Sequence, residues 1–363
     1  MREISPTLTK ELSEHIGNNP VASSAPYEVC TYRQLVEQIA KLSYLNKDNL
    51  LFFRGQKNDY LNKAESTTLY PSIYRGDYLT HEELTYRFRY LDAAGKILCN
   101  QFKINNIDGT KDLERKRHIQ WSILQHYEVC ETPLLDITQS LRVACTFSLM
   151  DNPNSFGHVY VLGLPYLTNR ITYNSEHDII NIRLLSICPP EALRPYFQEG
   201  FLAGTTDITT NFENKNELDF KNRLIAKFKI STLVQYFLGD EFKLLPRSAI
   251  YPYDDRVDKI CKRVKKEVNI SLNPGEIGEF LEKWSEIETM LLEKTKQYRK
   301  SNTISNALKI MQKQQLLDHD IITQIYKIKR LRNEVVHSPK NLRKTLIGYF
   351  NILDSIINEL KQL

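Results

Sequence analysis

The stretch Leu50-Leu51-Phe52-Phe53-Arg54-Gly55-Gln56 decides the fold of the first part of the chain. A short apolar run of this kind that ends in Arg-Gly is typical of a buried strand. The preceding segment, 31–42, repeats its apolar residues at helical spacing and begins with Thr31, a suitable N-cap. We therefore expect a helix followed by a buried strand that presents Arg54 at the edge of a sheet.

Further strands are expected downstream of this stretch. Segments 157–163 and 224–230 are rich in β-branched and aromatic residues, which favour strands. Residues 132–140 lead into the apolar segment 141–149, so that Asp136 and Thr138 fall where a strand passes into a helix. Side chains at such junctions are often presented to ligands. The first module is thus predicted to be mixed α and β.

The periodicity changes from Glu276 onward, where four apolar stripes with helical i, i+3, i+4 spacing follow one another. Their members are Ile277, Phe280, Leu281, Trp284, Ile287 and Leu291; Ile304, Ala307, Leu308 and Met311; Ile321, Ile325, Ile328, Leu331 and Val335; and Leu342, Leu346, Tyr349, Leu353, Ile356 and Leu360. Short polar joints separate the stripes. They predict an all-α, up-down bundle of antiparallel helices.

The fold class is therefore α+β, with a mixed α/β domain followed by a helical bundle. Asn273-Pro274-Gly275 has the composition of a turn and separates the two. We expect an N-terminal lead at 1–24, a first domain at 25–265, a linker at 266–275 and the bundle at 276–363.

Composition and charge exclude several classes of protein. With 363 residues, 41% of them hydrophobic and 26% charged, the chain fits about two folded domains. Its amino end is too polar for a secretory signal, and no apolar run approaches the roughly 18 residues that span a bilayer. We expect a cytoplasmic protein without a membrane partner. Its six cysteines form no CxxC pair, so we expect reduced thiols and no metal site. A net charge of +5 is too small to indicate nucleic-acid binding by itself.

The segment Arg332-Asn333-Glu334-Val335-Val336-His337 carries the clearest chemistry. Five positions separate Arg332 and His337 by roughly 140° on a regular helix, but the following Ser338-Pro339 favours a helix end at which His337 can turn back. Histidine exchanges protons near neutral pH, and arginine holds phosphate. The pair suits metal-independent RNA cleavage, with the 2′-hydroxyl as nucleophile and Asn333 positioning the phosphate or the histidine.

This R-x4-H motif, on the third helix of an expected bundle, resembles the HEPN superfamily over about residues 276–363. The resemblance implies an endoribonuclease of a bacterial toxin or antiphage system that acts on RNA as a homodimer, with Arg332, Asn333 and His337 as catalytic residues. An antitoxin or a phage trigger would control it. A catalytically silent bundle used for dimerisation is the alternative.

A second resemblance rests on several motifs in order. Phe53-Arg-Gly-Gln56, Leu69-Tyr-Pro-Ser-Ile-Tyr-Arg75, Leu124-Gln-His-Tyr127, Leu134-Leu-Asp-Ile-Thr-Gln-Ser140 and Val143-Ala-Cys-Thr-Phe147 together resemble the FRG domain family over about 25–265. Where that family usually has an arginine and a tryptophan around Leu-Leu-Asp, this chain has Pro133 and Ile137. We interpret this module as a sensor or regulatory domain, and the candidate pocket residues are Arg54, Gly55, Gln56, His126, Asp136, Thr138, Ser140, Gln198 and Glu199.

The same residues are also reminiscent of ADP-ribosyltransferases, which would make NAD the cofactor. Arg54 would hold the pyrophosphate, Gly55 would let the cofactor approach the backbone, and Glu199 would stabilise the oxocarbenium-like sugar. His126 and Asp136 would instead hold the fold if their hydrogen bonds are purely structural. Three functions follow: an RNA-cutting effector with the FRG domain as sensor and no cofactor, an ADP-ribosyltransferase-like enzyme dimerised by its bundle, and a non-enzymatic binding protein.

Overall fold

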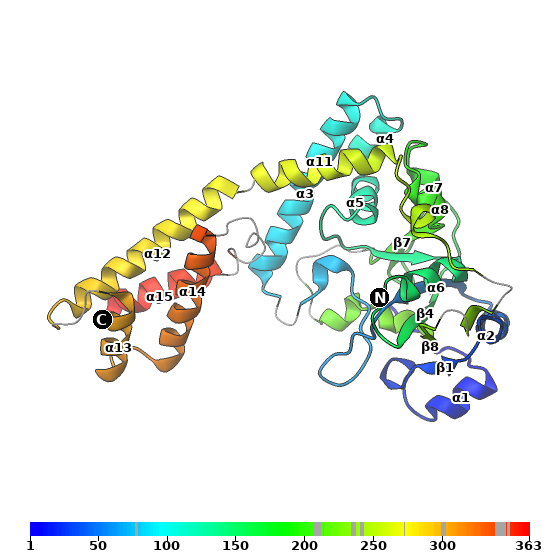
Figure 1. Ribbon diagram of the computed structural model, residues 1–363, viewed down its shortest axis with the longest axis horizontal. Coiled ribbons are helices and arrows are strands. Elements are labelled where there is room, and N and C mark those ends of the chain that lie inside the picture. The colour runs from blue at the N-terminus through cyan, green and yellow to red at the C-terminus, as the bar shows by residue number, and fades with distance from the viewer. Residues whose placement is uncertain are drawn as a thin grey trace. The chain divides into compact units, whose positions relative to one another are not determined.

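The computed structural model describes residues 1–76, 79–206, 212, 214–233, 237–239, 243–271, 273–298, 303–337, 346 and 349–363, without the side chains of residues 82, 269–271, 273–276, 334, 337 and 351. The chain divides into two compact units (Figure 1). Unit 1 comprises Met1–Leu79 and Arg87–Lys265, and unit 2 comprises Thr80–Tyr86 and Lys266–Leu363. Unit 1 is mixed α and β, and the helices of unit 2 are described separately below.

Unit 1 is built on a mixed eight-stranded sheet of order β1-β8-β4-β2-β3-β7-β6-β5. β1 runs parallel to β8, and the other neighbours pair antiparallel. The strands are β1 (Tyr27–Val29), β2 (Leu50–Gln56), β3 (Leu135–Thr138), β4 (Phe156–Leu164), β5 (Ile171–Asn174), β6 (Ile179–Arg183), β7 (Gly200–Gly204) and β8 (Leu224–Ser231). The predicted strands at 50–56, 157–163 and 224–230 are confirmed.

Both faces of the sheet are covered, which explains the continuous apolar run of β2. Alternate residues of a strand point to opposite faces. Leu51 and Phe53 accordingly belong to one buried cluster with α6 residues, whereas Phe52 belongs to a second cluster on the other face. The central strands therefore have no face left for alternating polar residues.

The helices of unit 1 precede, connect and follow these strands along the chain. They are α1 (Lys10–Ile16), α2 (Tyr32–Leu45), α3 (His81–Ile104), α4 (Thr110–Arg115), α5 (Arg117–His126), α6 (Leu141–Leu149), α7 (Leu184–Ile187), α8 (Arg194–Phe197), α10 (Arg247–Ile250) and α11 (Arg256–Ser271), with 3-10 turns η1 (Val21–Ser23), η2 (Ser72–Tyr74), η3 (Lys215–Leu218) and η4 (Phe220–Arg223). The first residues of α3 and the last of α11 belong to unit 2. Thr31 caps α2 as predicted, since its hydroxyl accepts a hydrogen bond from the Gln34 amide.

Two glycines allow α6 to pack directly on the sheet. A Cβ atom on Gly55 of β2 would lie 1.8 Å from the Ala144 carbonyl oxygen, and one on Gly157 of β4 would lie 2.5 Å from that of Ser148. Both obstacles are helix backbone, which cannot swing aside as a flexible side chain can. The close approach of α6 to β2 and β4 therefore requires glycine at both positions.

Residues 1–24, expected as a lead outside the domain, belong to unit 1. Leu12 of α1 is buried in the cluster that covers one face of the sheet, and Ile4 packs against that cluster. Backbone amides of Arg2 and Ile4 donate to the carbonyl groups of His177 and Asn222. The predicted boundary at residue 25 is therefore wrong, because the segment supplies part of the core.

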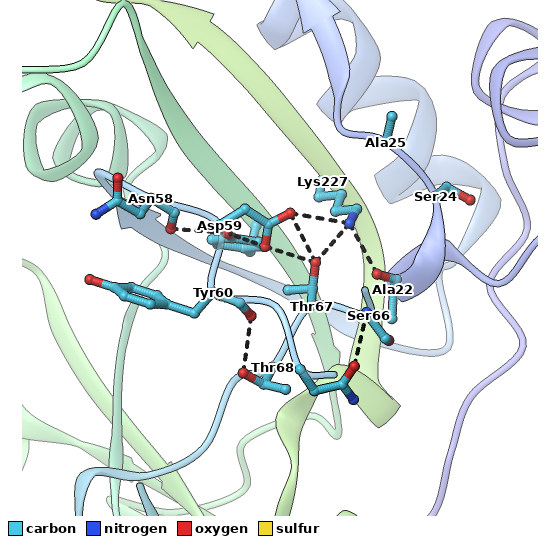
Figure 2. A network of polar contacts seen from close by, with 12 residues as sticks. Ala22, Ser24, Ala25, Asn58, Asp59, Tyr60, Ser66, Thr67, Thr68 and Lys227 are labelled. Carbon is cyan, nitrogen blue, oxygen red and sulfur yellow. Dashed lines mark hydrogen bonds and ion pairs between the residues drawn. The ribbon is translucent and has the colours of Figure 1, made fainter. Parts of the chain in front are cut away.

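A buried network fixes the loop that follows β2 (Figure 2). Lys227 of β8 donates to the Ala22 carbonyl at 3.0 Å, to the Thr67 hydroxyl at 2.7 Å and to the Asp59 carboxylate at 3.3 Å. Tyr160 of β4 also donates to Asp59, at 3.0 Å. Burial lowers the pKa of Lys227, and the neighbouring Asp59 opposes that shift. The loop from 57 to 68 and the segment around Ala22 are thereby tied to the same strand.

We expect Asp59→Asn to cost about 1–3 kcal/mol of stability, because it removes the anion that compensates a buried ammonium group. Chemical denaturation of the full chain measures this, with the exposed Asp48→Asn as a matched control. Adding Lys227→Met should recover part of the loss, since coupled groups are not additive. Equal stability of wild type and Asp59→Asn would show that the pair contributes nothing.

Besides the first residues of α3 and the last of α11, unit 2 contains four complete helices, α12 (Asn273–Thr295), α13 (Ile304–Lys313), α14 (His319–His337) and α15 (Phe350–Gln362), among the residues that the structure describes. They share one buried apolar cluster, in which Trp284, Met311, Ile325 and Leu353 represent the four predicted stripes. Of those stripes, Leu342 lies outside the described residues. None of the helices in the described part of the chain is long and apolar enough to cross a membrane.

The turn predicted at Asn273-Pro274-Gly275 is wrong, because these residues form the first turn of α12. Proline is tolerated there, since the amide that it lacks would have no partner within the helix. Residues 266–271 of the predicted linker are likewise helical and end α11.

Candidate functional site

A cavity of about 260 Å³ lies in unit 1 at the ends of β2 and β3. β2 pairs with β3 at Phe53 and Thr138, and β3 pairs with β7 at Thr138 and Gly200. The lining residues are Phe53, Arg54, Gly55, Gln125, His126, Glu128, Asp136, Ile137, Thr138, Phe147, Arg194, Gln198, Gly200, Phe201 and Tyr251. Asp136 and Thr138, the residues predicted where the strand passes into the helix, therefore both line a cavity.

Asp136 is the acidic group of this cavity. Its Oδ2 accepts a hydrogen bond of 2.6 Å from Gln125 Nε2, and the Gln125 Oε1 in turn accepts from Ser72 and Thr132. Surrounding protein alone would raise the pKa of Asp136, but His126, Arg54 and Gln125 outweigh this and lower it to about 2. The carboxylate is ionised at neutral pH and 41% exposed, so a ligand can reach it.

His126, at the end of α5, lies beside this carboxylate. Its Nδ1 is 3.7 Å from Asp136 Oδ1, too long for a hydrogen bond but close enough for electrostatic attraction. Burial lowers the pKa of His126, and Asp136 only partly opposes the shift. We therefore assign a neutral imidazole that carries its proton on Nδ1, toward the carboxylate. Its buried Nε2 has no hydrogen-bond partner among the described residues and is left as an acceptor.

The lowered pKa of His126 predicts a pH dependence of stability. Below the ordinary histidine pKa of 6.5, His126 binds a proton in the unfolded chain but stays neutral in the folded chain. The free energy of unfolding therefore falls as the pH drops through this range. His126→Gln should make that fall shallower, by at most about 1.4 kcal/mol per pH unit. Denaturant titrations at several pH values below 7 measure both slopes. Burial also lowers the pKa values of His118, His158 and His177, so a residual slope is expected. Parallel slopes in the two proteins would contradict the assignment.

Two arginines face the same cavity. Arg54 Nη1 donates to the Asp136 carbonyl at 2.6 Å, while its buried Nε has no partner among the described groups. Burial, with Arg75 as a second cause, lowers the pKa of Arg54 to about 10, so it keeps its charge at neutral pH. Arg194 pairs with Glu128 and lies 4.6 Å above the centre of the Tyr251 ring. Its Nε is also buried without a partner in the described part of the chain.

Thr138 and Gln198 line the cavity but also hold its wall together. The Thr138 hydroxyl lies 3.1 Å from both the Gln198 and the Glu199 carbonyl and accepts from the Ser140 amide at 3.0 Å. Gln198 Nε2 donates to the Ile250 carbonyl at 2.9 Å. Because these hydrogen-bonding groups are occupied, we assign both side chains a structural part in the site.

Four other predicted residues have different positions. Glu199 is exposed, in a left-handed turn with φ of 43°, and it does not line the cavity. Gln56 and Ser140 are also absent from the lining. Gly55 lines the cavity, and its missing side chain makes room for Ala144 of α6. The predicted approach of a cofactor to its backbone stays a prediction.

Several lining residues were not predicted, although the sequence placed them near motif residues. Gln125 directly precedes His126 in the Leu124-Gln-His-Tyr127 motif, and Glu128 follows that motif. Arg194 lies four positions before Gln198, at the start of α8. For Tyr251 the sequence offers no local signal, because α10 brings it to the cavity through packing with Phe147, at 6.5 Å between ring centres.

In unit 2, Arg332 and Asn333 lie on α14, where Arg332 Nη1 donates to the Asn333 side-chain oxygen at 3.2 Å. Arg332 Nε is buried without a partner in the described part of the chain. α14 ends at His337, but the side chain of His337 and residues Ser338-Pro339 lie outside the described residues. The predicted approach of His337 to Arg332 therefore stays a prediction.

No cluster of three or more His, Cys, Asp or Glu is placed to hold a metal ion among the described residues. All six cysteines are free in the structure.

Unit 1 thus combines a mixed sheet with a polar, ligand-sized cavity at the ends of its strands. Residues 49–156 match the family model of the FRG domain. This match confirms the FRG resemblance over those residues, which include Arg54, Gln125, His126 and Asp136. A HEPN-like domain is not shown by a family match. Neither the curated proteins nor the solved structures contain a match to this chain.

Proposed function

We propose that unit 1 binds a small polar ligand in its cavity and that this ligand controls unit 2, a HEPN-type endoribonuclease of an antiphage or toxin system. The observation that carries the first part is the convergence of Arg54, His126 and Asp136, from three separate motifs, on one cavity. Charged groups without full partners beside aromatic walls are usual in ligand sites. The protein would act in the cytoplasm as a homodimer on RNA.

The second part rests on the R-x4-H resemblance and on elementary chemistry. The RNA 2′-hydroxyl would attack the adjacent phosphorus, forming a cyclic phosphate as the bond to the 5′-oxygen breaks. His337 would take the proton of the attacking hydroxyl, and a proton would return to the leaving oxygen. Arg332 would stabilise the charge on the phosphate oxygens. The contact of Arg332 with Asn333 supports a shared role in holding the phosphate.

An ADP-ribosyltransferase-like reaction with NAD is the second candidate, because Arg54 and a carboxylate share one cavity. Glu199 does not fit the role of the sugar-stabilising acid, since it is exposed outside the cavity. Asp136 would have to supply that charge. In this reading the helices of unit 2 serve dimerisation.

One experiment separates these functions. Wild type, Arg332→Ala/His337→Ala and Arg54→Ala are expressed in bacteria, and growth, RNA integrity and transfer of label from NAD are followed. RNA loss that disappears in the double variant supports the ribonuclease. Label transfer that disappears only in Arg54→Ala supports the transferase. Intact RNA and no transfer from a folded wild-type protein would leave a non-enzymatic binding protein and overturn the proposed function.

A further inference from the structure

The cavity of unit 1 presents unpartnered groups of both kinds, donors and acceptors. Among the described residues, Arg54 Nε and His126 Nε2 are buried and lack any hydrogen-bond partner. Both residues line the cavity, and His126 is only 4% exposed. Buried polar groups without partners cost free energy, so such groups in a cavity wall indicate a polar ligand.

The charges restrict what that ligand can be. Arg54 is a cation with an unpaired N–H, and guanidinium groups prefer phosphate or carboxylate. Asp136, whose backbone carbonyl Arg54 contacts, is an anion that accepts hydrogen bonds and repels other anions. A bare anion would meet this repulsion, and a neutral polyol would leave the Arg54 Nε–H without an anionic partner. A ligand with a negative group at one end and hydroxyl donors at the other satisfies both Arg54 and Asp136.

The Asp136 carboxylate keeps acceptor capacity for the hydroxyl groups of a ligand. Its Oδ1 is 3.7 Å from His126 Nδ1 and accepts no hydrogen bond from the described residues, whereas the unpartnered His126 Nε2 is a separate acceptor on the other edge of the ring. Gln125 occupies the other carboxylate oxygen and fixes its orientation. A vicinal diol offers two hydroxyl donors, and a carboxylate is a common partner for ribose hydroxyls.

The size of the cavity and its walls add a further limit. At about 260 Å³ it falls just below the range of about 300–1,000 Å³ that is usual for drug-sized ligands. The lining includes the aromatic rings of Phe53, Phe147 and Tyr251, which suit the face of a sugar or base. A mononucleotide or a smaller molecule fits these dimensions better than a whole dinucleotide.

We infer that the cavity of unit 1 recognises a phosphorylated ribose, with Arg54 on the phosphate and Asp136 with His126 on the ribose hydroxyl groups. This inference rests on the proposed ligand-binding role of unit 1 and names the chemical class of the ligand. A free sugar phosphate and a mononucleotide share this chemistry.

Isothermal titration calorimetry of the full chain tests the inference with ribose 5-phosphate, AMP, adenosine and inorganic phosphate. Ribose 5-phosphate or AMP should bind at least about tenfold more tightly than adenosine and phosphate, because only they satisfy both ends of the site. Binding of AMP but not ribose 5-phosphate would identify the nucleotide as the source.

Two variants separate ligand contact from a structural role. Arg54→Gln should weaken the binding of phosphorylated ligands about tenfold and leave the binding of adenosine unchanged. Arg33→Gln, at an exposed position, is the control and should change neither affinity. Asp136→Asn should weaken the binding of ribose 5-phosphate. It should not weaken the binding of inorganic phosphate, because the substitution removes a charge that repels this anion. Circular dichroism confirms that each variant is folded. A merely misfolded site would lose all ligands together, which contradicts the inference.

Two results would overturn the inference in different ways. Adenosine that binds as tightly as AMP would show a ligand site without phosphate recognition, and the proposed binding role of unit 1 would survive. A folded wild-type protein that binds none of the four probes at millimolar concentration would overturn the assignment of a phosphorylated ribose as the ligand. An RNA cleavage assay of the same preparation then tests the proposed ribonuclease activity of unit 2 independently.

Discussion

Gly55→Ala should cost unit 1 about 3 kcal/mol or more and leave much of the protein insoluble, because it places a methyl group inside helix backbone. The added carbon would lie 1.8 Å from the Ala144 carbonyl oxygen and 3.0 Å from the Ser148 nitrogen. α6 would have to move away from β2, and residues of the cluster beneath it, such as Phe53 and Cys145, would lose packing.

Thermal and denaturant unfolding measure this effect. Gly278→Ala, in α12, is the matched control, since its added carbon meets nothing within 4 Å. Alanine there should be neutral or stabilise the helix by up to about 1 kcal/mol. A Gly55→Ala protein that unfolds together with wild type would contradict the packing of α6 on β2.

The second large effect is expected in RNA cleavage by the purified full chain. His337→Ala should lower the rate about 100-fold or more, because it removes the proton-transfer group, and Arg332→Ala should lower it through lost phosphate stabilisation. The rate of cleavage of a labelled RNA, measured with a chelator present, provides the comparison.

Lys327→Ala is the matched control for this loss. Lys327 is an exposed cation on the same helix, α14, so its removal tests whether any lost charge on that helix slows cleavage. The rate should stay close to that of wild type. Equal losses in Lys327→Ala and Arg332→Ala would show that general charge, and not the motif, supports RNA binding.

Much of the fold could be predicted because it follows from local patterns. The continuous apolar run of β2 reflects burial on both faces of the sheet. Thr31 caps α2 because its hydroxyl can accept a hydrogen bond from a backbone amide of the first turn. The prediction of a turn at Asn273-Pro274-Gly275 was wrong because these residue types suit a turn between helices and equally the first turn of a helix. The packing of residues 1–24 into unit 1 could not be predicted, since it depends on contacts with segments such as 177 and 222 that are remote in sequence.

The candidate site divides in the same way. Arg54, His126 and Asp136 stood out by residue type and motif, and the structure places them on one cavity. The part played by Gly55 depends on the position of α6, which no local pattern contains. Glu199, the predicted sugar-stabilising acid, lies in a left-handed turn that leaves its side chain exposed. Residue type thus indicated the chemistry, whereas backbone direction decided which side chains take part.

Control of unit 2 by the cavity of unit 1 can be measured directly. RNA cleavage by the purified full chain is followed while ribose 5-phosphate is added, in wild type and in Arg54→Gln. We predict that the ligand changes the wild-type rate and leaves the rate of Arg54→Gln unaltered. The same response in both proteins, or an unchanged wild-type rate under conditions where calorimetry shows the ligand bound, would contradict the proposal that the cavity governs RNA cleavage.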